Sequence, residues 1–429
     1  MRRLFLFVIL IAAVWPASGN ALTMEEGLQI VSETGRDVKI ALSNENIAQS
    51  GVWLARSPLF PQIDAYGNQT WLRYQPQSKL GPVIAPTADN NYVTYGITAT
   101  QILYDFGKTY SSIDAAKYML KAKEIETQRA RNRAALDFII AYYDLLEADK
   151  LLQVGREDVE RYEAHKKDAD ARYSGGIVTR NEVLEADVKL ADSRQRYLIV
   201  DNLRSFRASR LNSLLLRSLN EAVQAEEVTK SPSAGISLEQ AWAVAETESP
   251  EIRIIDAGIL GQEESVKAIR AEYFPGFFLQ GNYQYQENAY VVRQENWSLV
   301  AGITLNISAG GATSAKISMG RAELISLKHT RDKIADAVRL DVKNAYLDLQ
   351  SSMQRIDVMR TSVAQAEENL RLQRLRYQEG VGTAIEVLDA VTLLSTSQTN
   401  WWRARYDFER AEAGLLYAMG KELVRTYGK

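Results

Sequence analysis

The apolar positions of this chain fall into two long stretches with a seven-residue period. Small or apolar residues recur at alternating steps of four and three through residues 108–172 and again through residues 313–377. Neither stretch contains proline, and each contains a single glycine. A sustained heptad predicts helices that pack lengthwise as coiled coils. At 1.5 Å per residue, each stretch makes a rod of about 95–100 Å.

Each long helix is followed by a glycine turn and a returning helix. The turns are Gly175-Gly176 and Gly380-Val381-Gly382. The returning helices open with Thr179-Arg180-Asn181-Glu182 and Thr383-Ala384-Ile385-Glu386, and both fit the capping box, in which the Thr and the acid three residues later exchange hydrogen bonds. The pattern therefore predicts two helical hairpins, at about 108–219 and about 311–419.

Four shorter segments show the two-residue period of strands. We expect strands at about 62–74, 92–103, 277–287 and 296–307, with an exposed loop over residues 75–91. In the last strand Trp297, Leu299, Ala301, Ile303, Leu305 and Ile307 share one face. Such segments are typical of transmembrane β-strands and equally of a small soluble sheet with one face on a core.

The order of elements occurs twice. Arg172-Tyr173 and the turn that follows return as Arg376-Tyr377, and Ala141-Tyr142-Tyr143-Asp144-Leu145 returns as Ala345-Tyr346-Leu347-Asp348-Leu349. The copies are about 214 residues apart early and about 204 apart later, too long a period for a solenoid of small units. We therefore expect tandem halves at 22–220 and 236–421, joined by a linker at 221–235, each with short helices, two strands and a long hairpin.

The N-terminus reads as a secretory signal. Met1-Arg2-Arg3 is followed by an apolar run from Leu4 to Trp15 and then by small residues, which predicts a signal peptide over residues 1–21. No later apolar stretch approaches the roughly 20 residues of a membrane helix, so entry into a membrane would require strands.

Composition narrows the function classes. The chain has no cysteine, and 51 basic residues stand against 54 acidic ones, with no basic patch that would indicate a nucleic acid. Its two histidines, His165 and His329, lie in charged helical stretches and are interpreted as surface residues, so we expect no metal site. No nucleophile motif, histidine–carboxylate pair or phosphate loop accompanies the helices, so an enzyme and a cofactor are not expected.

The strands and the heptads both point to an oligomer. Four strands cannot close a barrel, and an open edge in lipid leaves backbone amides unpaired at several kcal/mol each. A lone hairpin of this length would likewise expose a long apolar seam. Three chains would pool twelve strands and twelve helical rods, so the predicted fold class is mixed α and transmembrane β: a trimeric 12-stranded β-barrel continuous with a 12-helix α-barrel.

At the hairpin turns and the strand-to-helix transitions, the chain resembles the TolC-like outer-membrane efflux proteins. The resemblance covers nearly all of the mature sequence in both halves, and the segment from Arg376 through Thr383-Ala384-Ile385-Glu386-Val387-Leu388-Asp389-Ala390 is its most specific part. It implies a homotrimer in the outer membrane that extends into the periplasm. It also implies a passive exit duct, for efflux or type I secretion, that docks with a periplasmic adaptor and an inner-membrane pump.

Candidate functional residues cluster around the two turns. Glu386 and Asp389 share a helix face, Glu182 and Glu185 repeat the spacing, and in a trimer they would form carboxylate rings that favour cations. Helix capping is the competing interpretation for Glu182 and Glu386. The resemblance implies that Tyr377 tethers the closed turns; where relatives carry a basic residue this chain has Gly382, and Arg180 is the candidate substitute.

The turns themselves are the candidate adaptor-docking surface. Exposed apolar side chains at a turn favour a partner, although ordinary turn packing is the alternative for any one residue. The residues are Gly176, Ile177, Val178, Gly380, Val381 and Gly382. The competing function is a soluble periplasmic coiled-coil scaffold or adaptor without a membrane barrel.

Overall fold

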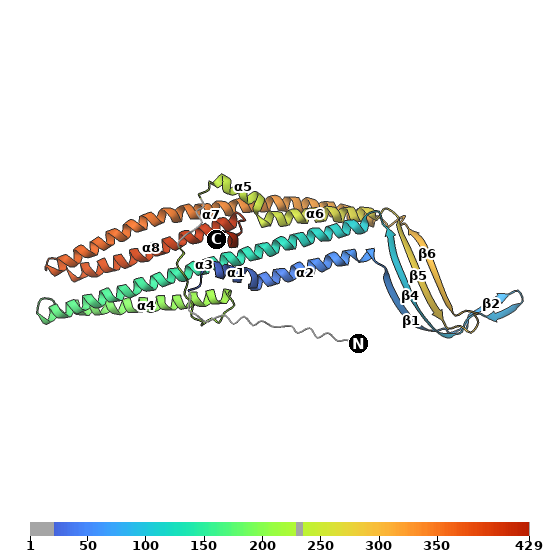
Figure 1. The fold of residues 1–429 in the computed structure, drawn as a ribbon, viewed down its shortest axis with the longest axis horizontal. Coiled ribbons are helices and arrows are strands. Elements are labelled where there is room, and N and C mark those ends of the chain that lie inside the picture. The colour runs from blue at the N-terminus through green and yellow to red at the C-terminus, as the bar shows by residue number, and fades with distance from the viewer. Residues whose placement is uncertain (1–20, 229–234, 429) are drawn as a thin grey trace, which may run out of the picture.

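A computed structural model describes residues 21–228 and 235–428. The molecule is a long helical body with a β-sheet at one end and both hairpin turns at the other (Figure 1). The predicted signal peptide lies outside the described residues, except for Ala21. Residues 229–234 of the predicted linker also lie outside them.

The helices follow the tandem order. The first half contributes α1 (Met24–Thr34), α2 (Arg36–Arg56), the 3₁₀ turn η1 (Ser57–Leu59), α3 (Lys108–Ser174) and α4 (Arg180–Leu214). The second contributes α5 (Leu238–Glu248), α6 (Pro250–Ala271), α7 (Ala312–Gln378) and α8 (Ala384–Ala418), and a short α9 (Leu423–Tyr427) that the sequence pattern did not predict. The first returning helix ends at Leu214, five residues before the predicted Leu219.

The two longest helices begin in the same way. Gly107 and Gly311 precede α3 and α7 with φ of 86° and 84°, a left-handed conformation that glycine adopts without steric penalty. Each helix then runs for 67 residues, which at 1.5 Å per residue is about 100 Å. The strand-to-helix transition is therefore a sharp turn built twice from the same backbone geometry.

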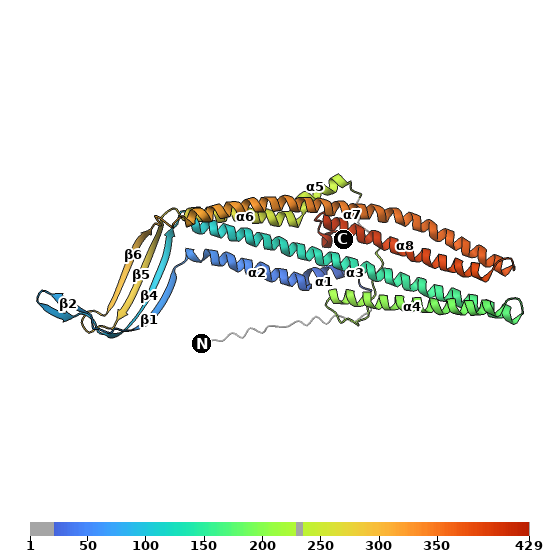
Figure 2. The ribbon, with the colours of Figure 1, turned by 180° about the vertical axis from the view of Figure 1, so that it is seen from behind.

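The long helices lie side by side at two levels. Nearer the sheet, α3 packs against α2 and α6, and α6 packs against α7. Nearer the turns, α3 packs against α4 and α8, and α8 packs against α7 (Figure 2). At both levels α3 has neighbours on two sides, whereas α7 has its long neighbours on one side only. The chain is therefore a curved wall four helices wide with two open edges.

The main core lies midway along this wall. Leu28 of α1, Phe138 and Tyr142 of α3 and Leu423 of α9 are buried together there. The Tyr142 hydroxyl donates to the backbone carbonyls of Leu22 and Glu226 at 2.8 and 2.7 Å. This core holds both ends of the described first half, and the C-terminal helix, against α3.

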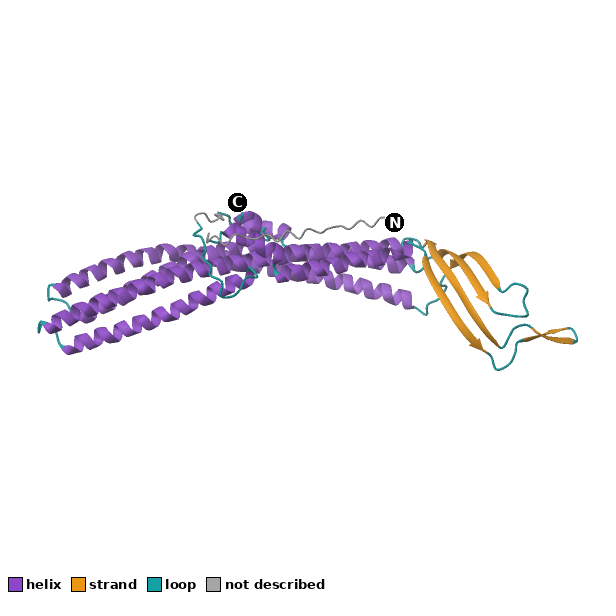
Figure 3. Ribbon diagram, turned by 60° about the horizontal axis from the view of Figure 1, so that its bottom comes forward, coloured by secondary structure: helices purple, strands orange, loops and turns teal. Residues whose placement is uncertain are grey.

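The sheet is antiparallel with the strand order β1-β4-β5-β6. Its strands lie beyond one end of the helical body (Figure 3). Its strands are β1 (Gln62–Trp71), β4 (Asn91–Tyr104), β5 (Gly276–Gln286) and β6 (Glu295–Thr304). The central pair, β4 and β5, comes from different halves of the chain. Leu305 and Ile307, expected on the last strand, lie beyond its end because pairing with β5 stops at Thr304.

The segment expected as a plain loop carries a second hairpin. Strands β2 (Gln77–Leu80) and β3 (Val83–Pro86) pair across a turn at Gly81, whose φ is 65°. The prediction of a plain loop was wrong. The two strands have only four residues each, and the proline and asparagine around them are typical of loops. The hairpin extends past the end of the main sheet (Figure 1).

Candidate functional site

The two faces of the sheet differ in chemistry. Register places Ile97, Tyr283 and Trp297 opposite one another on one face, with Ala99, Gly281 and Leu299 in the next row. The other face carries Thr98, Asn282 and Ser298, and Thr98 donates to Asn282 at 3.0 Å. Asp64 and Glu295 are the only charged residues in these four strands. Asp64 pairs with Thr98 and so lies on the polar face, whereas Glu295 pairs with Tyr285 at the strand end of the apolar face. One face of the sheet is therefore mainly apolar, and the other is polar.

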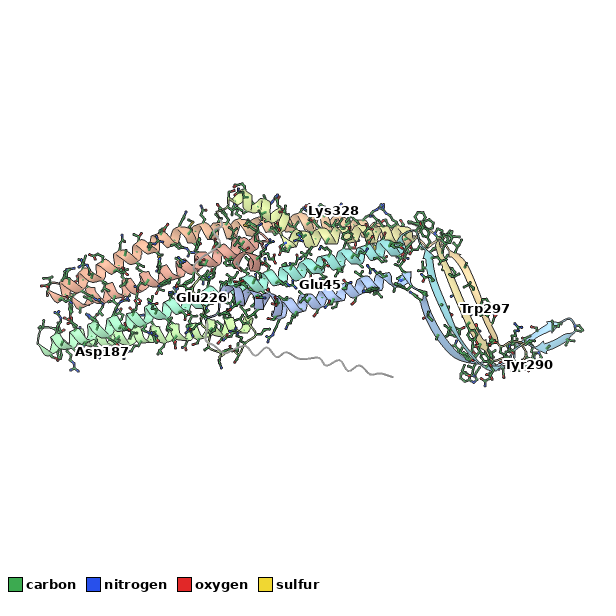
Figure 4. The ribbon with its side chains drawn as sticks, viewed as in Figure 1. Glu45, Asp187, Glu226, Tyr290, Trp297 and Lys328 are labelled. Atoms are coloured by element: carbon green, nitrogen blue, oxygen red, sulfur yellow. The ribbon has the colours of Figure 1, made fainter. Side chains whose placement is uncertain are left out.

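The apolar face is exposed rather than packed on a core. Trp297 is 76% exposed and Leu299 64%, and Figure 4 shows Trp297 on the sheet away from the helices. A soluble sheet buries its apolar face against another layer. No helix among the described residues covers this one. The arrangement fits strands whose apolar side meets lipid.

Aromatic residues gather near both ends of the strands. Tyr95 stacks on Tyr285 at 4.8 Å between ring centroids, toward the β2–β3 end. Phe106 stacks on Phe274 at 5.1 Å, at the helical end. Aromatic residues near both ends of a strand of about ten residues are typical of transmembrane β-strands. Among the described residues, no helix is long and apolar enough to span a membrane.

Both hairpin turns lie together at the far end of the body, a region we call the turn end (residues 175–179 and 379–383). Gly176 and Gly380 adopt φ of 73° and 75°, which explains glycine at both positions. Ile177 and Val381 are 71% and 70% exposed, and Val178 is half-buried. At Gly382 an added Cβ would lie 3.0 Å from the Cβ of Arg376, so a side chain there is crowded.

Glu386 caps its own helix. It accepts from the Thr383 amide at 2.9 Å, and its amide donates to the Thr383 hydroxyl at 3.3 Å. The hydrogen bond from the Thr383 amide lowers the pKa of Glu386, helped by Arg376 at 3.7 Å. Glu386 therefore has the capping role, and its role at the aperture, which a capping acid can also have, stays a prediction.

Glu182 does not cap its helix, so the predicted capping box at Thr179 was wrong. The Thr179 side chain makes no capping hydrogen bond. The Tyr377 hydroxyl donates instead to the Glu182 carboxylate at 3.5 Å. Burial raises the pKa of Tyr377, which keeps this hydroxyl protonated and able to donate. The predicted tether and a predicted aperture acid are thus partners, and they join the two halves of the chain.

The other predicted charged residues are not joined to this pair. Asp389 is exposed on α8, Glu185 is half-buried on α4, and Arg180 is exposed beside the first turn. None of the three forms an ion pair within residues 21–228 and 235–428. Asp389 is therefore a free carboxylate one helical turn from Glu386.

His165 is buried, so its interpretation as a surface residue was wrong. The side chain is 7% exposed, and its ring centroid lies 5.6 Å from that of Tyr377. The Arg172 guanidinium lies over the same tyrosine ring at 4.5 Å. The covering residue Tyr377 is distant in sequence, which local charge content cannot reveal. His329 is exposed, as expected.

A charged node that the sequence analysis missed lies midway along the body. Asp144 is 8% exposed and accepts from Arg410 of α8 at 2.9 Å, while Arg207 and Arg210 of α4 also reach it. Its repeat equivalent, Asp348, is exposed. The repeated Ala-Tyr-x-Asp-Leu segment was the available signal in the sequence. No cluster of three or more potential metal-binding side chains occurs in the described part of the chain.

A sheet with one exposed apolar face, mounted on paired helices of about 100 Å, is consistent in fold with an outer-membrane channel. The family model "Outer membrane efflux protein" matches residues 28–215 and 244–421. The chain therefore belongs to the outer membrane efflux protein family, whose members include TolC, and it is an outer-membrane efflux channel. This family consists of channels rather than enzymes.

Individual relatives are similar over nearly the whole chain. Outer membrane efflux protein BepC of Brucella suis is 24% identical, covering 96% of this chain and 90% of its own length. The pyoverdine export outer membrane protein OpmQ of Pseudomonas aeruginosa is 22% identical, with coverages of 95% and 86%. The outer membrane protein VceC of Vibrio cholerae has the same fold, with a TM-score of 0.79 at 17% identity and coverages of 93% and 96%.

Proposed function

We propose that three copies of this chain form a passive exit duct, with a 12-stranded β-barrel in the outer membrane continuous with a 12-helix barrel in the periplasm. One comparison between the halves carries the proposal. Leu136 of α3 is 6% exposed, whereas its repeat equivalent in α7, Leu340, is 67% exposed. Leu136 lies in the main core with residues of α1, α4, α8 and α9, whereas α7 has long neighbours on one side only.

A second copy of the chain supplies the missing neighbour. Within the chain α3 packs against α8, so the tandem repeat predicts that α7 packs against α4 of the next copy. The sheet also lacks neighbours at its edges, because β1 and β6 each have one unpaired edge among the described strands. Joining β6 to β1 of the next copy pairs these edges, and twelve strands close a barrel.

The turn end is the proposed periplasmic aperture. Three copies would place Asp389 and Glu386 in stacked rings, with Glu182 and Glu185 supplying further carboxylates around them. The Asp389 carboxylate is exposed, which supports its role in attracting cations to the aperture. Glu386 is held in the helix cap, so we expect it to contribute less to cation selectivity. The Tyr377–Glu182 contact is the proposed tether, and Arg180 is exposed beside it for a link between copies.

The exposed apolar turns support docking of a periplasmic adaptor, which connects the duct to an inner-membrane pump of a tripartite efflux or type I secretion system. The docking residues are Gly176, Ile177, Val178, Gly380, Val381 and Gly382. Ile177 and Val381 present uncovered side chains at matching positions of the two turns.

Disrupting the proposed interface tests the assembly. We expect wild-type protein in detergent to have the mass of three chains by light scattering, and Leu340→Asp to give single chains. Ile177→Asp is the matched control, because it places the same charge on an equally exposed side chain away from the interface. A single-chain wild type, or a trimeric Leu340→Asp variant, would contradict the assembly.

A further inference from the structure

We propose that His165 is a positioning residue that holds Tyr377 against Glu182, and that protonation of His165 releases this contact and opens the aperture. The proposal rests on the proposed function of the turn end. It adds a proton-responsive residue, one that neither forms the aperture nor contacts the cargo.

The geometry makes His165 the support of the tether. Tyr377 of α7 is 5% exposed and belongs to a buried cluster with Leu370, Val387 and Leu388. The His165 ring packs against one part of the tyrosine, at 5.6 Å between centroids, and the Tyr377 hydroxyl reaches Glu182 of α4. The position of the hydroxyl therefore depends on a side chain from α3.

The site accepts a neutral imidazole and disfavours a charged one. The Nε2 atom of His165 is buried and has no hydrogen-bond partner among the described residues. Protonation adds a charge and makes both ring nitrogens N–H donors, so Nε2 would be a buried donor without an acceptor in a charged ring, which is strongly disfavoured. The imidazolium would therefore leave the pocket for water, which removes the packing behind Tyr377.

Burial and the nearby arginines together lower the pKa of His165, and one nearby carboxylate opposes them. Burial lowers the pKa of His165, Asp168 on α3 opposes this, and Arg374 on α7 and Arg172 on α3 lower it further. Asp168 is itself paired with Arg172 at 3.1 Å, and Glu182 on α4 accepts from Tyr377. On α8, Glu386 caps its helix and Asp389 is exposed.

The lowered pKa fixes the direction of the pH effect. The closed contact holds His165 neutral, whereas a released His165 has the ordinary pKa of about 6.5. The closed contact is therefore fully stable above about pH 6.5 and is lost as the pH falls below that value. A single coupled proton changes the closed-to-open equilibrium by at most about tenfold per pH unit in each copy.

Single-channel recording of the full-length protein in planar bilayers tests the proposal. Between about pH 7.5 and about pH 5.5 we expect the open fraction of the wild type to rise by about threefold or more. His165→Phe keeps the aromatic packing and should abolish the rise. His329→Phe, the matched control at the other histidine, should retain it. An equal rise in wild type and His165→Phe, or no rise in wild type, would overturn the proposal.

A second measurement needs no channel activity. In a His329→Gln background His165 is the only histidine, so a ¹³C-histidine NMR signal reports on it alone. We expect its pKa to lie below the ordinary value of about 6.5, and to shift back toward that value in the further variant Tyr377→Ala. Titration near 6.5 in both proteins would overturn the role of His165. If His165 titrates as expected but the protein forms no channels, the result would count against the proposed duct and not against the role of His165.

Discussion

Leu184 and Leu388 occupy equivalent positions on the returning helices of the two halves, yet Leu184 is 51% exposed and Leu388 is 1% exposed. The sequence around them is nearly the same. The difference is positional, because α8 lies between α3 and α7, whereas α4 lies at an edge of the wall and packs mainly on α3. Repeat-equivalent residues with different burial therefore mark where another chain is expected.

This pair predicts two different effects of the same substitution. Leu388→Ala should lower the free energy of unfolding by about 2–4 kcal/mol, because it leaves a cavity in a packed cluster. Leu184→Ala should change the stability of the single chain little and should weaken the trimer. Thermal unfolding combined with light scattering at several protein concentrations separates the two. Equal losses of chain stability would contradict the assignment of Leu184 to an interface.

Asp144 and Asp348 make a second matched pair. Asp144→Asn should lower the unfolding free energy by about 2–4 kcal/mol, because it removes the buried partner of Arg410 and leaves that guanidinium half-satisfied. Asp348→Asn, at the exposed equivalent, should change it by less than about 0.5 kcal/mol. The measurement is thermal or denaturant unfolding in detergent. A comparable loss in both variants would show that the node does not hold α3, α4 and α8 together.

The helix caps after the two turns predict a third contrast. Thr383→Ala should destabilise the start of α8 by about 1 kcal/mol, because it removes one side of a complete capping box. Thr179→Ala should have a smaller effect, since Thr179 makes no capping hydrogen bond. Amide hydrogen exchange over the first turns of α8 and α4 measures both. A larger increase in exchange at α4 in Thr179→Ala than at α8 in Thr383→Ala would contradict the assignment.

The sequence predicted the elements whose signals are local. Heptads, strand alternation and glycine turns located the long helices and the sheet to within a few residues at most ends. The β2–β3 hairpin was missed because each strand has only four residues and lies among turn-forming ones. The local sequence pattern was therefore sufficient to predict elements that are long and have a regular period.

The site was predicted less completely because its contacts cross between halves. Thr-x-x-Glu occurs after both turns, but only Glu386 forms the box, since Tyr377 from the other half engages Glu182. The local pattern of α3 predicts His165 as a surface residue, whereas the structure buries it, with the ring of Tyr377 from α7 packed against it. The role of Asp144 likewise depends on arginines from α4 and α8.

The most direct test of the duct is single-channel conductance of the purified protein in a planar bilayer, comparing the wild type with Asp389→Ala and Glu386→Ala. We expect small cation-selective openings in the wild type. Asp389→Ala should lose much of the cation selectivity, and Glu386→Ala should mainly affect stability, because Glu386 is held in a cap. Unchanged selectivity in Asp389→Ala would remove that residue from the aperture. A folded trimer that forms no channel would contradict the account.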